Sequence, residues 1–165
     1  MVLQQLLKAF ERYYTIQTEQ LKKPFAAEAQ FHSHTEHYLL VKAAQIAESE
    51  DHEFVFFIQE PKLSLPRLKQ LCELTWQEGL GRVHPHIHHR NSDITLVIVA
   101  DEVEKEVWTQ IKRISYVKAH RFSLHGWSHF KLLVYQPPSA KTASNRLGKD
   151  LEKIIQKITN TQEKK

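Results

Sequence analysis

At 165 residues the chain is long enough for one domain with a sizeable core, and its 41% hydrophobic and 25% charged content is ordinary for a globular protein. No apolar run approaches the roughly 20 residues of a membrane-spanning helix. The amphipathic start from Met1 to Tyr14 lacks the features of a secretory signal. The single cysteine, Cys72, cannot form an intramolecular disulfide, which suits a reducing cytosol. We therefore expect a cytoplasmic protein with no membrane partner.

The charge is mildly basic, with a net charge of +4 and an isoelectric point near 9.1. This balance permits contact with nucleic acid without requiring it. The basic residues are spread along the chain; only residues 141–157 and the tail from Gln162 are locally rich, and both include acidic residues. We expect a solvated surface, with nucleic acid as a partner that is open but not indicated. The aromatic content also leaves a homodimer open.

The first part of the chain predicts a helix followed by three strands. Leucine and aromatic residues recur at helical spacing over residues 2–19, and Pro24 disfavours helix in the residue before it. Alternation and a buried apolar run are typical of the strands that follow. A short polar turn at 49–52 favours a hairpin, and therefore a strand before it. The three predicted strands are 25–32, 38–48 and 54–58.

A second helix is predicted after Ser64, whose hydroxyl can cap it. Pro66 occupies the first turn, where a missing N–H costs nothing, and we expect Gly79 and Gly81 to end the helix. Residues 94–100 form the longest run of strand-forming apolar residues. This run predicts a central strand.

The last third of the chain predicts a helix, two strands and a final helix. Asp101 and Glu104 have the spacing of a capping box at the start of the third helix. Alternation predicts strands at 116–124 and 127–136, with Gly126 at the hinge, and a polar linker after them. The apolar stripes of the two helices are Val103, Val107, Ile111 and Ile114, and then Leu147, Leu151, Ile154, Ile155 and Ile158.

In chain order the elements are α-β-β-β-α-β-α-β-β-α. This order predicts an α+β fold in which helices pack on a mainly antiparallel sheet. Residues 1–160 are expected to form the single domain, and residues 161–165 a disordered C-terminal tail.

Two clusters of the chain's 11 histidines are the strongest candidates for chemistry. Neutral imidazole is the commonest metal ligand, and His-x-His on a strand places both rings on one face. The candidate ligands for zinc or another transition metal are His32, His34, His37, His84, His86 and His88. The alternative, which we favour, is a set of surface and loop imidazoles without metal, because most such spacings are coincidental.

Two hydrolase hypotheses use metal. The stretch from His32 to His37 has the spacing of the metal-binding signature of metallo-β-lactamase-like hydrolases, but Glu36 stands where Asp is usual and the downstream context is missing. The opening order α-β-β-β-α-β resembles the restriction-endonuclease core, and Glu60 and Lys62 form an acid-x-lysine pair. The candidate carboxylates for such a Mg²⁺-dependent nuclease are Glu28, Asp51 and Glu60.

Other catalytic patterns are missing from the sequence. It has four glycines and no nucleophile elbow, phosphate loop or dinucleotide fingerprint. Cys72 lies on an apolar helix face, where we expect a buried and inert thiol. A polar and aromatic tip surrounds Gly126. It consists of Arg121, His125, Trp127 and His129. We interpret it as a turn in preference to a ligand site.

Four patterns span the chain. They are Phe31-His32 with Glu36 and Tyr38; Glu78-Gly79-Leu80 with Arg82-Val83 and Pro85-His86; Arg121-Phe122-Ser123-Leu124-His125-Gly126-Trp127; and Asn145-Arg146 with Gly148-Lys149. In these patterns the chain resembles a family of uncharacterised bacterial proteins, a domain of unknown function from mainly Gram-positive genomes. The resemblance covers nearly the whole chain and implies a single domain. It implies no catalytic residue, because the family has no assigned activity.

We therefore expect a small non-catalytic protein that acts through binding or association. The alternative is a metal-dependent hydrolase or nuclease that uses the histidine clusters or the three carboxylates. The sequence leaves open whether the chain is an enzyme.

Overall fold

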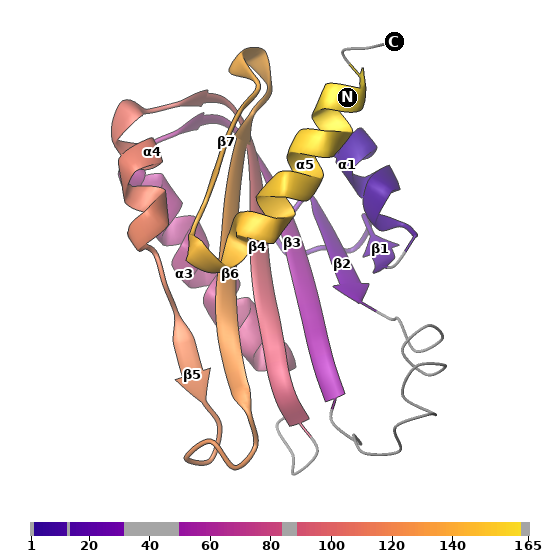
Figure 1. Cartoon of the computed structure of the whole chain (residues 1–165), viewed down its shortest axis with the longest axis vertical. Helices are drawn as coiled ribbons and strands as arrows, with labels where there is room; N and C mark the ends of the chain where they lie inside the picture. Colours follow the sequence, from indigo (N-terminus) through magenta and orange to yellow (C-terminus); the bar gives the residue numbers. More distant parts are fainter. Residues whose placement is uncertain (1, 13, 32–49, 84–88, 163–165) are drawn as a thin grey trace.

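A computed structural model describes residues 2–12, 14–31, 50–83 and 89–162 (Figure 1). The helices are α1 (Val2–Phe10), α3 (Leu65–Arg82), α4 (Lys105–Gln110) and α5 (Lys149–Gln162), with short 3-10 helices η1 (Ile111–Arg113), η2 (Pro137–Ser139) and η3 (Arg146–Gly148). The strands are β1 (Tyr14–Gln17), β2 (Ala27–Phe31), β3 (Glu50–Leu63), β4 (His89–Val103), β5 (Val117–Ala119), β6 (Trp127–Gln136) and β7 (Lys141–Ser144). Over these residues, no helix has the length and apolar character needed to span a bilayer.

The strands form one mixed sheet in the order β1-β2-β3-β4-β6-β5, and β7 pairs with β6 on the same edge as β5. Among the described strands, four of the six pairings are antiparallel. The predicted α+β single domain with a mainly antiparallel sheet is therefore confirmed. The two long central pairings, β3 with β4 and β4 with β6, are parallel. Helix α3 makes the crossover between β3 and β4 that a parallel pair requires.

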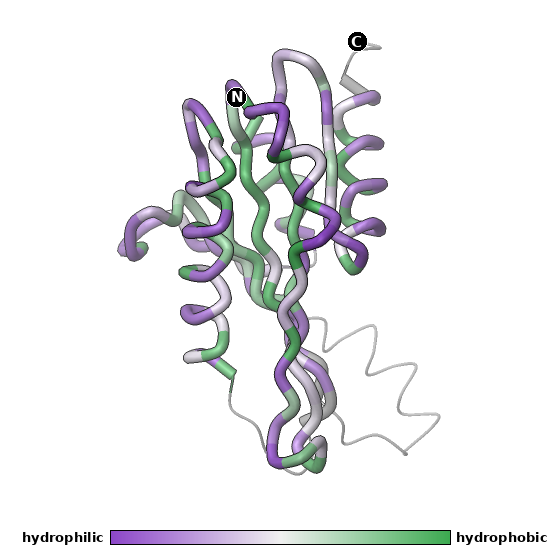
Figure 2. The backbone as a smooth tube through the Cα atoms, turned by 90° about the vertical axis from the view of Figure 1, so that its left-hand side faces the viewer, coloured by the Kyte–Doolittle hydropathy of each residue, from purple (hydrophilic) through white to green (hydrophobic). Residues whose placement is uncertain are grey.

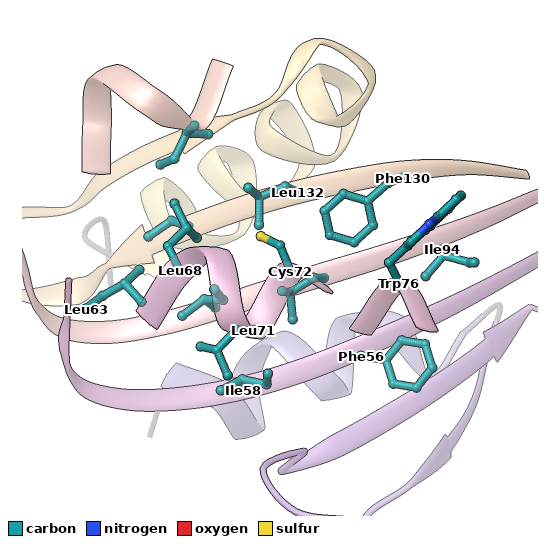
Figure 3. Close-up of a cluster of buried hydrophobic side chains, with 14 of the residues drawn as sticks. Phe56, Ile58, Leu63, Leu68, Leu71, Cys72, Trp76, Ile94, Phe130 and Leu132 are labelled. Atoms are coloured by element: carbon teal, nitrogen blue, oxygen red, sulfur yellow. The ribbon is translucent and has the colours of Figure 1, made fainter. Parts of the chain in front are cut away.

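Helices cover both faces of this sheet (Figure 1). On one face α3 and α4 pack against a large apolar core, which includes Phe56, Ile94 and Phe130 (Figure 3). On the other face α1 and α5 cover a second core, with Phe57 and Val97 at its centre. Because both faces of the central strands are buried there, their sequences are continuous apolar runs. This explains why residues 94–100 form a central strand, as predicted.

Helix α3 begins as predicted but ends later. Ser64 caps it, since its hydroxyl accepts a hydrogen bond from the Arg67 amide at 3.3 Å. The helix then continues through Gly79 and Gly81 to Arg82, so the expected end at the glycines is wrong. A Cβ atom on Gly79 would lie 2.5 Å from the side chain of Ile94. Gly79 therefore serves the close approach of α3 to β4 and does not terminate the helix.

Two predicted helices are shorter than expected because strand pairing overrides their helical spacing. Helix α1 ends at Phe10, and residues 14–17 form β1, in which Ile16 lies opposite Ala29 of β2. The capping box expected at Asp101 is also wrong, because β4 continues to Val103. Helix α4 begins after Glu104, whose side chain makes no capping hydrogen bond.

Three further expectations concern the ends and the connections. The linker after β6 contains a seventh strand, β7, which pairs with β6. In the last helix Ile155 is buried and Ile154 is 51% exposed, whereas Leu147 precedes that helix in η3 and is 42% exposed. The strand expected at 38–48 and residues 163–165 of the expected tail lie outside the described residues.

Candidate functional site

The sheet extends beyond the helices on the face that carries α1 and α5 (Figures 1 and 2). The apolar residues Val55, Val97 and Leu133 lie under these helices. Since alternate residues of a strand share a face, the residues that precede them by two or four positions continue the same face. They are polar in each of the three strands. We call the resulting group the polar sheet face: Glu53 on β3, Asp93 and Thr95 on β4, and His129 and Lys131 on β6.

The register of the strands sets two carboxylates side by side. Glu53 lies opposite Asp93, and Asp93 lies opposite His129. One step toward the helices, Thr95 lies opposite Lys131. Neighbouring strands are about 4.8 Å apart, so like charges in opposite positions destabilise a sheet unless other groups compensate them. The surrounding side chains supply this compensation.

Tyr14 and Thr95 both donate hydrogen bonds to Glu53. The Tyr14 hydroxyl lies 2.7 Å from Glu53 Oε2, and the Thr95 hydroxyl lies 3.4 Å from Oε1. Burial raises the pKa of the Tyr14 phenol above its ordinary value, and the charge of Glu53 and its hydrogen bond raise it further. Tyr14 therefore keeps its proton at neutral pH and acts as a donor.

Lys131 compensates the second carboxylate. Its Nζ lies 2.8 Å from Asp93 Oδ2, and the two side chains are 26% and 31% exposed. Burial acts to lower the pKa of Lys131, but the hydrogen bond and the charge of Asp93, together with Glu53 and Asp150, outweigh it and raise that pKa. Lys131 is therefore an ammonium ion at neutral pH. The formal charge of Glu53, Asp93 and Lys131 together is minus one.

Aromatic side chains border the polar sheet face. Tyr14 packs against Phe31, with ring centroids 5.5 Å apart. Trp127 lies on β6 two positions before His129, and so on the same face, and it is 40% exposed. Carboxylates next to aromatic faces are the groups that bind organic ammonium ions in proteins. The polar sheet face therefore has the composition of a site for a positively charged ligand.

The predicted metal ligands His32, His34, His37, His84, His86 and His88 lie outside the described residues. The metal site accordingly stays a prediction. Within the part of the chain that the structure describes, no group of three or more His, Cys, Asp or Glu residues is placed to hold a metal ion.

Two of the three carboxylates predicted for a nuclease site, Glu28 and Glu60, form ion pairs with different arginines. Glu28 forms a two-point ion pair with Arg82, at 2.5 and 2.8 Å. Glu60 pairs with Arg67 at 2.8 Å. The two arginines belong to opposite ends of α3, about 22 Å apart at 1.5 Å per residue. Glu28 and Glu60 therefore do not converge on one site, and the side chain of Asp51 lies outside the described residues.

Sequence reasoning placed Cys72 correctly and missed the polar sheet face. Cys72 is buried, and burial raises the pKa of its thiol to about 12, so it is inert at neutral pH. Glu53, Asp93 and Lys131 come from strands far apart in the chain, so the register alone unites them. The available signal was the polar alternation of Asp93 with Thr95 and of His129 with Lys131, directly before apolar runs.

A family model described as Domain of unknown function (DUF8052) matches residues 1–157. The chain belongs to this family. The resemblance to a family of unknown function is thus confirmed, and the match covers nearly all of the chain. Neither a curated protein nor a solved structure matches it. Any function has to be inferred from the side chains of this chain itself, because the family description assigns none.

Proposed function

We propose that this chain is a non-catalytic binding protein whose polar sheet face binds a small organic ligand that carries an ammonium group. One observation carries this proposal. Glu53 and Asp93 lie in opposite register positions, and Lys131 supplies the one ammonium ion of the polar sheet face. A bound ammonium ion would balance the remaining negative charge and relieve the repulsion between the two carboxylates.

The carboxylate of Glu53 has acceptor positions left for a ligand. An ionised carboxylate has about four acceptor positions, and Tyr14 and Thr95 use two of them. The exposed part of Trp127 offers an aromatic face to the same ligand. Charge, hydrogen-bond capacity and apolar contact therefore favour the same class of molecule.

The protonation states of Tyr14 and Lys131 support binding over catalysis. A general base or an amine nucleophile must lose its proton near neutral pH. The raised pKa values of Tyr14 and Lys131 oppose this loss. Both groups are donors at neutral pH, which is the state that suits ligand binding. The buried free thiol of Cys72 further supports a cytoplasmic location as part of this proposal.

Thermal unfolding in the presence of choline, agmatine and spermidine tests the proposal. At ten times its dissociation constant a ligand stabilises the folded state by about 1.4 kcal/mol, so the midpoint rises by about 3–6 °C. We expect this rise for at least one of the three amines. Glu53→Gln and Asp93→Asn should each abolish it.

The matched control is Glu102→Gln. Glu102 lies on β4, as Asp93 does, and pairs with Lys62 at 3.3 Å near the other end of that strand. This variant should keep the full response. The absence of a response to all three amines, or an equal loss in the control, would count against the proposal.

A further inference from the structure

Acidic residues are missing from one long stretch of the chain. Residues 107–149 contain eight Lys and Arg residues and no Asp or Glu, whereas residues 1–106 contain 16 acidic and 11 basic residues. The net charge of +4 is therefore distributed unevenly: residues 107–149 are basic, and residues 1–106 carry an excess of acidic residues. Such asymmetry is typical of proteins that contact polyanions.

The fold places this stretch along one edge of the sheet (Figure 1). It includes η1, β5, β6, β7 and η3, and β5 and β7 both pair with the outer side of β6. We call six of its exposed basic residues the cationic edge: Lys112, Arg113, Lys118, Arg121, Arg146 and Lys149. The seventh exposed basic residue, Lys141, is not counted because its ammonium group lies over the Trp108 ring, 4.4 Å from the ring centroid. Within the described ranges, no ion pair engages any of these six side chains.

The hairpin between β5 and β6 presents apolar side chains at one end of this edge. Phe122 is 99% exposed and Leu124 is 75% exposed. Arg121, Phe122 and Ser123 all have positive φ angles, of 45°, 52° and 73°. Left-handed backbone is costly for residues other than glycine, and it persists where the surrounding structure imposes it.

The surrounding hydrogen bonds hold this tip in place. The amide of His120 donates to the carbonyl of Gly126 at 2.9 Å, and the amide of His125 donates to the carbonyl of His120 at 3.1 Å. Below the tip, the buried His120 ring lies 2.7 Å from the Ser128 hydroxyl. These hydrogen bonds therefore hold the turn in the conformation that exposes Phe122.

We propose that the cationic edge and the tip at Phe122 together bind single-stranded nucleic acid. The cations pair with successive phosphates, and the phenyl ring of Phe122 provides a face on which one base stacks. Strand β6, which the edge follows, has ten residues and is about 33 Å long, enough for several nucleotides. The residues of this surface are not those of the polar sheet face, and the proposal does not depend on the function proposed for that face.

The geometry favours this partner over three others. An anionic membrane would meet the tip alone, while the cations continue along the edge. A duplex keeps its bases stacked and leaves no base for Phe122. A second copy of the chain that docked through the same edge would bring two cationic surfaces together, which costs free energy.

Fluorescence anisotropy with labelled 12-nucleotide RNA and DNA of mixed sequence tests the proposal. With three to five phosphates neutralised, the slope of log K against log salt concentration should be about −2 to −3.5. Phe122→Ala should weaken binding about tenfold, because it removes one stacked base. The pair Lys118→Gln/Arg121→Gln should reduce the slope by about 1.4. All three side chains are exposed, so the variants should fold, which circular dichroism checks.

Controls come from the part of α5 that follows Lys149, outside the cationic edge. Ile154→Ala removes an apolar side chain that is 51% exposed, and Lys153→Gln removes a cation that is 72% exposed. Both should bind RNA as the parent chain does. The proposal is overturned if neither oligonucleotide binds, if a 12-base-pair duplex binds more tightly, or if the controls weaken binding as much as Phe122→Ala. Co-sedimentation with phosphatidylserine vesicles in place of RNA binding would also overturn it.

Discussion

The phenol of Tyr14 donates a 2.7 Å hydrogen bond to Glu53, which lies 39 residues further along the chain. Tyr14 belongs to β1 at the sheet edge and Glu53 belongs to β3, with β2 between them. The bond therefore fixes the edge strand to the polar sheet face. It exists because residues 14–17 form a strand and not the end of a helix.

Tyr14→Phe should lower the free energy of unfolding by about 1–2 kcal/mol near neutral pH, because it removes a hydrogen bond to a charged group. The folded state raises the pKa of Tyr14 above its unfolded value of about 10. The stabilisation linked to this proton is therefore complete below pH 10 and is lost as the pH rises above it. The difference between parent and variant should shrink from pH 9 to pH 11 in urea titrations. A difference that stays constant would contradict this account.

Gly79 and Gly81 form a matched pair on α3. Gly79→Ala should destabilise the chain by about 1–3 kcal/mol, because its Cβ would clash with the buried side chain of Ile94. Gly81 has no atom within 4 Å of its Cβ position, so Gly81→Ala should stabilise the helix by about 0.5–1 kcal/mol. Chemical denaturation measures both changes. Equal effects of the two substitutions would refute the packing role of Gly79.

Asn145 fills a gap at the edge of β6. Strand β5 pairs with residues 127–129 and β7 with residues 133–136, which leaves the middle of β6 without a strand partner on that side. The buried Asn145 side chain accepts from the amides of Leu132 and Gly148, and donates to the carbonyls of Ile114 and Phe130. One side chain thus replaces a missing piece of strand.

Asn145→Ala should therefore lower the free energy of unfolding by about 3 kcal/mol or more, because it leaves several buried backbone groups without partners. Asn160→Ala on the exposed side of α5 is the control and should change it by less than about 0.5 kcal/mol. Urea denaturation compares the two. If Asn145→Ala were as mild as the control, the bridging role would be wrong.

Metal binding through the histidine clusters stays a separate prediction, tied to the alternative of a metal-dependent hydrolase or nuclease. Elemental analysis of protein purified without a histidine tag tests it. The binding function expects no stoichiometric metal. If zinc, manganese or iron is present at one equivalent per chain and is lost in His32→Ala/His86→Ala, the metal-dependent alternative gains the advantage. Plasmid cleavage in Mg²⁺ by the parent chain and by Glu60→Ala tests the nuclease version.

The elements with long, regular patterns could be predicted from the sequence. The buried stripe of α3 and the apolar runs of β3 and β4 depend on local periodicity, which is visible in a single chain. Strands β1 and β7 could not be predicted, because four residues carry little pattern and neighbouring strands determine their conformation.

The polar sheet face was beyond sequence reasoning for a different reason. Glu53, Asp93 and Lys131 become neighbours through parallel pairing, and no local rule gives the register of such pairs. Some residues in the patterns that carry the family resemblance have structural roles. Gly79 lets α3 approach β4, and Asn145 and Gly148 close the edge of β6.

Titration of the ¹⁵N-labelled chain with agmatine, followed by backbone amide NMR shifts, tests the central claim most directly. The account predicts saturable shifts centred on Glu53, Asp93 and Lys131, and their loss in Asp93→Asn but not in Glu102→Gln. Shifts that centre on the Glu102 end of β4, or that never saturate, would contradict the proposal that the polar sheet face is the binding site.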